Sequence, residues 1–347
     1  MPKNIVVLTN DAGPSNGLQF VVNELKAQGH IVSDFLGKGK GLDAKIENKA
    51  SNAMLEADFV LFGISSTPET WVEEVNLANI AKATGKPYGF FCCNWGEFRR
   101  PAFASVMKGA NLLFTVDEAD AKSAKDFVGK DTLVVPSGNP AWADYFNSKM
   151  SREEARAKLG VDPDAKILLV NGSKESVRNI ILWFSSIEAT KMLRMNIKMF
   201  ISIHPGDPSP TGTYDMFFKS NADHAQKLPT GISTSQALNG VDLLISSISL
   251  VGVEAACLRK PVTDFVTPLD EMWWGGLSGS KDWKPAKDGA SVLVRNIDDL
   301  VSVIDTLNYG NNCFDDQIEN QERVFQRENV EGSAKRIVDE IVKTLAA

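Results

Sequence analysis

A serine-rich turn followed by a lone glutamate is the most informative chemical pattern in this sequence. Residues 241–261 read VDLLISSISLVGVEAACLRKP, an apolar run that ends in Ser246, Ser247 and Ser249 and continues as a predicted helix. The free N–H groups and positive partial charge at the start of a helix suit a phosphate. Glu254 is the only charged residue in the apolar part of that helix. Burying a carboxylate without a partner is costly, and a ribose diol is a suitable partner because a carboxylate accepts two hydroxyl protons.

Two other predicted strand ends carry residues that suit a diphosphate. Gly172, Ser173 and Lys174 follow one apolar run, and His204 follows the next. A glycine lets the backbone approach a ligand, and a lysine supplies positive charge to an otherwise acidic protein. The residues predicted to bind a nucleotide-activated donor, UDP- or CDP-linked, are Gly172, Ser173, Lys174, His204, Ser246, Ser247, Ser249 and Glu254. Structural alternatives stay open: a solvated lysine, a structural histidine, helix-capping serines, and a glutamate bonded to a neighbouring lysine or backbone group.

The first half of the chain offers two candidates for a general base. Transfer of a group to a hydroxyl needs a base within hydrogen-bond reach, and Asp11 and Glu97 both lie beside glycines in predicted loops after strands. We prefer Glu97, because Trp95 and Phe98 would partly desolvate it and raise its pKa. The residues predicted to contact the acceptor or a phosphate are Asn16, Trp95, Arg99 and Arg100. Surface ion pairs remain the alternative for the two arginines.

Neither a metal nor a dinucleotide cofactor is predicted. No cluster of His, Cys or carboxylates has ligand spacing, and no Asp-x-Asp motif ends a strand. The segment 9–17, predicted to be a flexible polar loop, lacks the G-x-G-x-x-G pattern of dinucleotide sites. The donor is therefore expected to act as a substrate whose diphosphate is balanced by helix N-termini and basic side chains.

The elements that must position these residues alternate between apolar runs and helical patterns, which predicts parallel βαβ units. The predicted strands cover 5–8, 31–36, 59–64, 88–93, 112–116, 132–135, 166–170, 198–203, 242–246, 261–265 and 292–294. The predicted helices cover 18–28, 71–84, 119–127, 151–160, 177–192, 250–258, 298–307 and 331–345. The stretch around Trp273, Trp274 and Trp283 is predicted to be irregular, with aromatics that either stack on a ligand or pack the loop.

The fold class expected from this alternation is α/β, with two Rossmann-like domains that face each other across a cleft. A Gly-Asn-Pro turn at 138–140 and a Ser-x-x-Glu capping box at 151–154 interrupt the alternation before it restarts at Lys166. We predict an acceptor domain over 1–147, a donor domain over 148–328, and a final helix over 329–347 that returns to the first domain. The 347 residues are too many for one ordinary core.

Composition excludes several classes of protein. Apolar residues make up 43% and charged residues 23%, as in ordinary globular proteins, and the formal charge of −7 argues against a nucleic-acid partner. No apolar run approaches the roughly 20 residues needed to span a bilayer, and a cytoplasmic location is expected. The four cysteines are expected to be plain thiols. The expected partners are the donor, an unidentified acceptor and, as a further possibility, another copy of the chain.

Several segments resemble the GT-B superfamily, which holds glycosyltransferases, CDP-glycerol glycerophosphotransferases and UDP-N-acetylglucosamine 2-epimerases. The resembling segments are 136–173, His204-Pro205-Gly206, the serine-rich turn with Glu254 and Lys260-Pro261, and 331–337. The resemblance covers about half of the chain and implies a metal-independent glycosyltransferase. The alternatives are an epimerase or hydrolase of nucleotide sugars, and a binding protein without catalysis.

The sequence departs from these families at three motifs. Gly63-Ile64-Ser65-Ser66 stands where a 2-epimerase would show an acidic residue. Ser247-Ile248-Ser249 replaces the usual Ser-Gly-Gly turn, and Trp95-Gly96-Glu97 lacks the histidine of the glycerophosphotransferase motif Trp-His-Gly. The acceptor half is therefore atypical for both enzymes.

Overall fold

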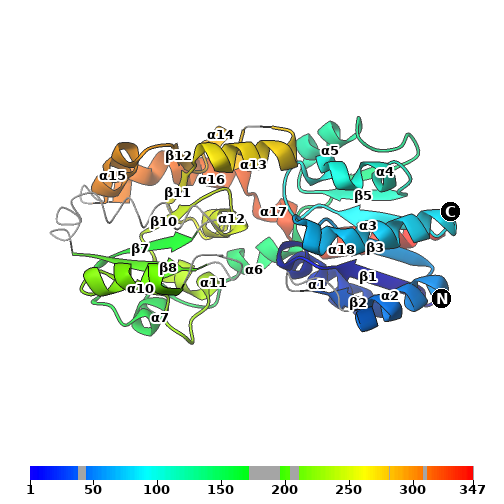
Figure 1. The fold of residues 1–347 in the computed structure, drawn as a ribbon, viewed down its shortest axis with the longest axis horizontal. Helices are drawn as coiled ribbons and strands as arrows, with labels where there is room; N and C mark the ends of the chain where they lie inside the picture. The colour runs from blue at the N-terminus through cyan, green and yellow to red at the C-terminus, as the bar shows by residue number, and fades with distance from the viewer. Residues whose placement is uncertain (38–43, 172–195, 204–210, 281, 308–310, 347) are drawn as a thin grey trace. The chain divides into compact units, whose positions relative to one another are not determined.

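The computed structural model describes residues 1–37, 44–171, 196–203, 211–280, 282–307 and 311–346. The chain forms two compact units (Figure 1). Unit 1 comprises Met1–Ala143, Gly275–Ser280 and Arg327–Ala347, and unit 2 comprises Asp144–Trp274 and Lys281–Gln326. Each unit contains one six-stranded parallel sheet with helices packed on it. The predicted class, α/β with two Rossmann-like domains, is confirmed.

The sheet of unit 1 places its first strand, β1, between β2 and β3. Its order is β2 (Ile31–Leu36), β1 (Asn4–Thr9), β3 (Phe59–Gly63), β4 (Tyr88–Phe91), β5 (Leu112–Thr115) and β6 (Leu133–Pro136). The helices of this unit are α1 (Ala12–Ala27), α2 (Ala44–Glu56), α3 (Pro68–Ala83), α4 (Ala104–Met107), α5 (Glu118–Ala124), α17 (Arg327–Val330) and α18 (Ser333–Thr344). Short 3-10 helices η1 (Glu97–Arg99), η2 (Pro101–Phe103) and η3 (Pro140–Trp142) complete it.

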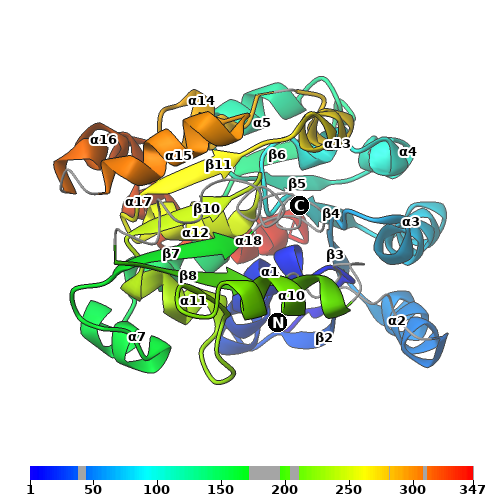
Figure 2. The same ribbon diagram turned by 60° about the vertical axis from the view of Figure 1, so that its left-hand side comes forward.

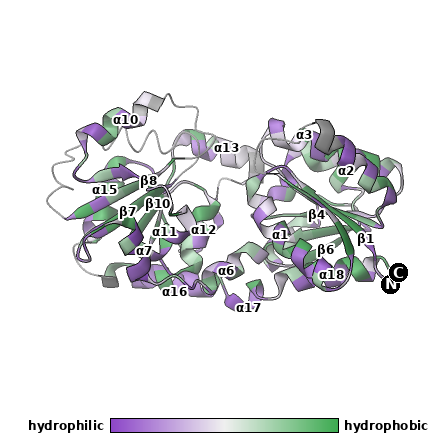
Figure 3. Ribbon diagram, turned by 90° about the horizontal axis from the view of Figure 1, so that it is seen from below, coloured by the Kyte–Doolittle hydropathy of each residue, from purple (hydrophilic) through white to green (hydrophobic). Residues whose placement is uncertain are grey.

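Burial on both faces explains why the four central strands of unit 1, β1, β3, β4 and β5, are almost wholly apolar. Alternate residues such as Val6, Val60 and Phe90 form one core with apolar residues of α2, α3 and α4. The strands are correspondingly hydrophobic, whereas the helices mix apolar and polar residues (Figure 3). The last helix, α18, packs against α1, and Arg336 donates a hydrogen bond to the Ser137 carbonyl oxygen at 2.9 Å.

The predicted polar loop over 9–17 was wrong from residue 12 onward, because α1 begins at Ala12. Asp11 caps this helix, and its side chain accepts a hydrogen bond from the backbone N–H of Ala12 at 2.8 Å. Pro14 is tolerated in the first helical turn, where the backbone N–H groups have no intrahelical partner. Gly17 lies inside the helix, where an added Cβ would approach the Phe91 ring and the Asn139 side chain to 2.8 Å. Gly17 therefore marks close packing inside a helix and not a flexible loop.

Unit 2 has a similar layout, with β7 between β8 and β10 (Figure 2), but two strands, β8 and β9, lie on one side of its first strand. The sheet order is β12 (Val292–Val294), β11 (Val262–Phe265), β10 (Leu243–Ser246), β7 (Lys166–Asn171), β8 (Ile197–Ser202) and β9 (Ala225–Lys227). The helices are α6 (Ala143–Phe146), α7 (Arg152–Leu159), α10 (Thr211–Ser220), α11 (Thr234–Ala237), α12 (Leu250–Cys257), α13 (Pro268–Ser278), α14 (Lys284–Lys287), α15 (Ile297–Thr306) and α16 (Asp315–Val324). Two 3-10 helices, η4 (Leu238–Gly240) and η5 (Asn311–Phe314), are also present.

The predicted irregular stretch in unit 2 was also wrong, because 268–278 forms helix α13. Trp274 and Trp283 are buried and meet edge to face at 5.1 Å, so they pack this region, whereas Trp273 is exposed. The predicted helix over 177–192 lies outside the described residues. No helix in the described part of the chain has the length and hydrophobicity needed to cross a membrane.

Candidate functional site

The strand orders locate one switch point in each sheet. In unit 1 the chain leaves β1 toward β2 on one side and later adds β3 on the other, and in unit 2 the strands β8 and β10 flank β7 in the same way. Open α/β sheets bind ligands where such a reversal occurs, beyond the carboxyl ends of the strands. The switch points therefore lie beyond β1 and β3 in unit 1, and beyond β7 and β10 in unit 2.

The switch point of unit 2 contains the predicted serine-rich turn. Ser246 and Ser247 are fully buried, and within the described residues their hydroxyl oxygens have no hydrogen-bond partner. Ser249 caps α12, and its hydroxyl accepts a hydrogen bond from the backbone N–H of Val251 at 3.3 Å. Buried hydroxyls normally find a partner. Two unpartnered hydroxyls beside a helix N-terminus therefore suit an anionic ligand.

Glu254 lies on α12, one turn beyond this helix start, and is half-buried. Burial raises the pKa of its carboxyl to about 7, and a hydrogen bond from the Tyr145 hydroxyl opposes that shift. Lys260 bonds elsewhere, since its Nζ donates to the Asn239 carbonyl oxygen at 2.8 Å. The carboxylate is therefore held by a tyrosine, a partner that sequence reasoning missed.

The other four predicted donor-binding residues are not among the residues that the structure describes. Gly172, Ser173, Lys174 and His204 lie outside the described residues, so their roles stay predictions. The strands that precede them are described: β7 ends at Asn171 and β8 at Ser202. At the end of β8, the Ser202 hydroxyl lies 2.8 Å from that of Thr234.

The turn between Ser247 and Ser249 holds an isoleucine in a strained conformation. Ile248 has a φ of +43°, a left-handed value that is uncommon for a β-branched residue. The buried carboxyl of Asp264 accepts a hydrogen bond from the Ile248 backbone. It also accepts from Trp283 Nε1 at 2.9 Å and from the Ser291 hydroxyl at 2.5 Å. Asp264 thus fixes the turn, and a lone carboxylate in the apolar strand 262–265 was the signal that could have revealed it.

Substitutions at Ile248 should reverse the usual stability order of alanine and glycine. The left-handed conformation costs a residue with a Cβ roughly 1–2 kcal/mol, whereas glycine loses about 0.4–1 kcal/mol to chain entropy. We expect Ile248→Gly to be more stable than Ile248→Ala by about 0.5–1 kcal/mol in urea unfolding. At Val253, inside α12, the usual order should hold, with Val253→Ala more stable than Val253→Gly by about 1 kcal/mol. The same order at both positions would contradict a strained turn.

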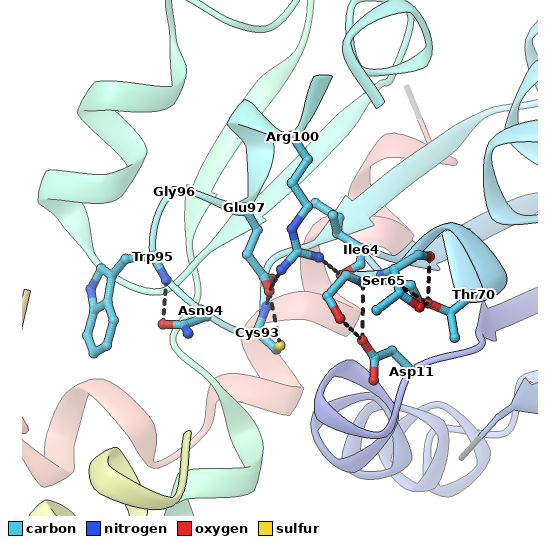
Figure 4. A network of polar contacts seen from close by, with 12 residues as sticks. Asp11, Ile64, Ser65, Thr70, Cys93, Asn94, Trp95, Gly96, Glu97 and Arg100 are labelled. Carbon is cyan, nitrogen blue, oxygen red and sulfur yellow. Dashed lines mark hydrogen bonds and ion pairs between the residues drawn. The ribbon is translucent and has the colours of Figure 1, made fainter. Parts of the chain in front are cut away.

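In unit 1 the switch point brings Asp11 next to the end of β3 (Figure 4). The Asp11 carboxylate accepts hydrogen bonds from the Ser66 backbone N–H at 3.1 Å and from the Ser66 hydroxyl at 2.7 Å. Asp11 is only half-buried. A partly accessible carboxylate at a switch point can contact a ligand, which Glu97, described below, cannot do without rearrangement.

A second carboxyl at this edge, Glu74, was missed by sequence reasoning. It projects from α3 and is fully buried. It accepts hydrogen bonds from the Thr9 hydroxyl at 2.9 Å, the Asn10 N–H at 2.7 Å, the Ser65 N–H at 3.0 Å and the Ser65 hydroxyl at 2.6 Å. Glu74 therefore ties the ends of β1 and β3 together. Helical spacing was the available signal, because Leu77, Ala78 and Ala81 share its face.

The ionisation of Glu74 should make stability depend on pH. Burial raises the pKa of Glu74 to about 7 despite four donors. Because this pKa is higher in the folded state than in the unfolded chain, the carboxyl's contribution is fully present below about pH 4.5 and is lost as pH rises to about 7. The full loss corresponds to about 3 kcal/mol.

Glu74→Gln should remove this pH dependence, which urea unfolding at several pH values can measure. At pH 5 the variant should be less stable than the wild type by about 1–3 kcal/mol, since the amide nitrogen would face a backbone N–H. The difference should shrink toward pH 8. The exposed Glu56 provides the matched control, Glu56→Gln. Parallel stability curves for wild type and Glu74→Gln would contradict the assignment.

Glu97, the preferred base in the sequence analysis, lies in a buried ion pair. One carboxylate oxygen is 2.8 Å from Arg100 Nη2, and the other accepts the Cys93 N–H at 2.7 Å. Arg100 also donates to the Ile64 carbonyl oxygen. Burial raises the pKa of Glu97 although Arg100 opposes the shift. Arg100 is likewise buried, so its pair with Glu97 is not the surface ion pair that the sequence left open. Losing one partner would leave an uncompensated buried charge, which would destabilise unit 1.

The remaining predicted acceptor residues differ in accessibility. Trp95 is buried, donates from Nε1 to Asp117 at 2.7 Å and stacks on Trp142 at 5.5 Å. Arg99 lies over the rings of Phe98 and Phe127 and donates to the Ser278 carbonyl oxygen at 3.1 Å. Asn16 is exposed on α1. Of the three, Asn16 is the most accessible to a ligand in unit 1.

Asp120, on helix α5, is the third buried carboxyl described in unit 1, besides Glu74 and Glu97. It accepts a hydrogen bond from the Gly96 N–H at 2.9 Å, and burial raises its pKa to about 7. In the described part of the chain, no group of three or more His, Cys, Asp or Glu is arranged to hold a metal ion.

Comparison with known protein structures identifies the fold. No protein-family model and no curated protein sequence matches the chain. An S. aureus MnaA–UDP structure matches with a TM-score of 0.72 and 13% identity over 100% of this chain and 97% of the other. The UDP-GlcNAc 2-epimerase from Neisseria meningitidis bound to UDP-GlcNAc matches with a TM-score of 0.69 and 12% identity over 98% of this chain and 99% of the other. The wall teichoic acid polymerase TagF matches with a TM-score of 0.60 and 13% identity over 100% of this chain and 89% of the other.

These similarities extend over nearly the whole chain, and the two six-stranded parallel sheets are those of the two-domain GT-B architecture. The fold of this protein is therefore the GT-B type, as the sequence resemblance implied. At 12–13% identity the likeness extends to the fold alone.

Proposed function

We propose that the protein is a GT-B type glycosyltransferase that moves a sugar or related group from a nucleotide-activated donor to an unidentified acceptor. The observation that carries the proposal is Glu254, a half-buried carboxylate on the helix α12, which Ser249 caps. Tyr145 of α6 holds this carboxylate by a hydrogen bond. The unpartnered Ser246 and Ser247 hydroxyls lie at the same switch point. In this proposal the carboxylate binds the ribose, and the helix start and serines bind the diphosphate.

The acceptor side of the proposal rests on unit 1. Of the two predicted bases, Asp11 is half-buried whereas Glu97 is buried in an ion pair, so the geometry favours Asp11 as the base. The preference for Glu97 came from sequence alone and stays a prediction. In either case the base acts on the acceptor hydroxyl, because a base must lie within hydrogen-bond reach of the proton that it removes.

Two alternatives have specific support. A nucleotide-sugar epimerase or hydrolase is favoured by the fold similarity to UDP-GlcNAc 2-epimerases. A binding protein without catalysis is favoured by the buried pair of Glu97 with Arg100, which removes one of two predicted bases from solvent. All three functions share the nucleotide-sugar site of unit 2.

One experiment separates these functions. The full chain is incubated with UDP-GlcNAc or CDP-glycerol, with and without a cell-envelope extract as acceptor, and the products are identified by mass spectrometry. Transfer predicts nucleotide release that depends on the extract. An epimerised sugar or a free sugar without extract would support the first alternative, and binding without turnover would support the second. Failure of both donors to bind would contradict the proposal.

Activity is expected to be independent of metal ions. Helix N-termini and basic side chains can balance a diphosphate without a cation. Turnover measured after extensive dialysis against EDTA should therefore equal turnover in the untreated protein. Loss of activity that returns with Mn²⁺ or Mg²⁺ would contradict this prediction.

A further inference from the structure

Unit 2 contains a short chain of hydrogen bonds that ends on Glu254. The Ser235 hydroxyl lies 3.0 Å from the Tyr145 hydroxyl, and Tyr145 is hydrogen-bonded to the Glu254 carboxyl. A phenol has one proton, and an ionised carboxylate can only accept. The Tyr145 proton is therefore directed at Glu254, and the Ser235 hydroxyl donates to the tyrosine oxygen. The three residues come from α11, α6 and α12.

This arrangement fixes the orientation of the carboxylate. An ionised carboxylate has about four acceptor positions, and Tyr145 uses one of them. Glu254 belongs to a helix whose remaining side chains are apolar, so nothing else on α12 restrains it. Without Tyr145, the side chain would retain rotational freedom that a ligand would have to remove on binding.

Few other charges surround this carboxylate. The Cys257 thiol lies further along α12, where burial raises its pKa and Arg259 lowers it. Arg259 in turn lies 4.0 Å from Glu322 of α16, and it donates to the Gln321 carbonyl oxygen at 3.1 Å. The segment 234–237 of α11, which packs against α12, contains no charged residue. Tyr145 is thus the main group that favours the ionised form of Glu254.

We infer that Tyr145 is a positioning residue which presents Glu254 to a vicinal diol, so that the site of unit 2 selects ribonucleotides over 2′-deoxyribonucleotides. The inference rests on the proposed nucleotide site. A carboxylate held at one oxygen still accepts two hydroxyl protons from a ribose, whereas a deoxyribose supplies only one. The lost hydrogen bond to a charged group corresponds to about tenfold in affinity.

Calorimetry with UDP and 2′-deoxy-UDP between pH 6 and 9 tests this inference on the full chain. The wild type should bind UDP about tenfold more tightly than the deoxy form above pH 8. Tyr145→Phe should reduce that ratio to about twofold or less, because the carboxylate is no longer oriented. Affinity should fall as pH drops, since Glu254 must be ionised to accept both hydroxyl protons. In Tyr145→Phe the midpoint should move to higher pH, by about one unit, because the bond that favours ionisation is gone.

A second readout does not need a nucleotide. The Glu254 carboxyl can be titrated by ¹³C NMR in glutamate-labelled protein, with Glu254→Gln assigning its signal, and Tyr145→Phe should raise its pKa. Tyr88→Phe is the matched control, because it removes a buried tyrosine hydrogen bond to Val106 in unit 1 and should change neither readout.

The possible outcomes separate the inference from the proposed function. Equal binding of UDP and 2′-deoxy-UDP by the wild type would overturn the ribose selection while leaving a nucleotide site. An unchanged ratio and an unchanged Glu254 titration in Tyr145→Phe would overturn the positioning role. If the wild type binds neither uridine probe, the comparison is repeated with CDP and 2′-deoxy-CDP. If none of the four binds, the proposed function and the ribose selection both fail, and the titration alone then decides whether Tyr145 holds Glu254.

Discussion

Asp11→Asn should lower turnover of the nucleotide sugar by about 100-fold or more while donor affinity stays near that of the wild type. Asn is as good a helix cap as Asp, so α1 should keep its start while the ability of the side chain to accept a proton is lost. One Asp11 oxygen accepts from the Ala12 N–H at 2.8 Å, and the other accepts from the Ser66 hydroxyl and N–H at 2.7 and 3.1 Å. The asparagine oxygen can keep the cap while its amide nitrogen donates to the Ser66 hydroxyl, so that only the Ser66 N–H loses its acceptor. The measurement is steady-state release of nucleotide in the presence of the acceptor extract, with donor affinity measured separately by calorimetry.

Two further variants make this prediction specific. Asp34→Asn changes an exposed aspartate that pairs with Lys26 in the same unit, and it should leave turnover unchanged. Glu97→Gln should lower thermal stability, since Arg100 would lose its charged partner in a buried site. If Glu97→Gln lowered turnover 100-fold in a protein of normal stability, and Asp11→Asn were harmless, the base would be Glu97. Full activity in both variants would favour a binding protein or a different mechanism.

Glu254→Ala should weaken binding of UDP or CDP by about 1–3 kcal/mol, which is roughly a 5-fold to 150-fold rise in Kd. The change removes the only carboxylate of α12, whose oxygens are the acceptors proposed for the ribose hydroxyls. The serines and the helix start would remain to bind phosphate. Isothermal titration calorimetry at pH 8, where the wild-type carboxyl is mostly ionised, gives the clearest comparison.

Glu271→Ala is the matched control for this experiment. Glu271 is a partly exposed glutamate of unit 2 that pairs with Arg295 at 2.7 Å, and its removal should leave nucleotide affinity unchanged. Circular dichroism would establish that both variants remain folded. An unchanged affinity in folded Glu254→Ala would remove the carboxylate from the site, and with it the observation that carries the proposed function.

The alternation of apolar runs and helical patterns was enough to predict the two sheets. Parallel strands are buried on both faces, so each reads as a short apolar run that is hard to miss. Helix boundaries were harder to predict where glycine and proline lie inside helices instead of in turns. Gly13, Pro14 and Gly17 looked like a loop but belong to α1, and Gly275 and Gly276 lie inside α13.

The sequence by itself determined the residue types at the strand ends, including Asp11, the serines after β10 and Glu254, because local order places them directly after apolar runs. Only the tertiary structure decided which of them are accessible and what holds them. Tyr145 and Glu254 are far apart in the chain, and so are Asp264 and Ser291, and no local pattern encodes their hydrogen bonds. The same reason applies to Glu97. Its spacing from Arg100 permits an ion pair either on the surface or in the core. The packing of the whole unit buries both residues, so the pair lies in the core.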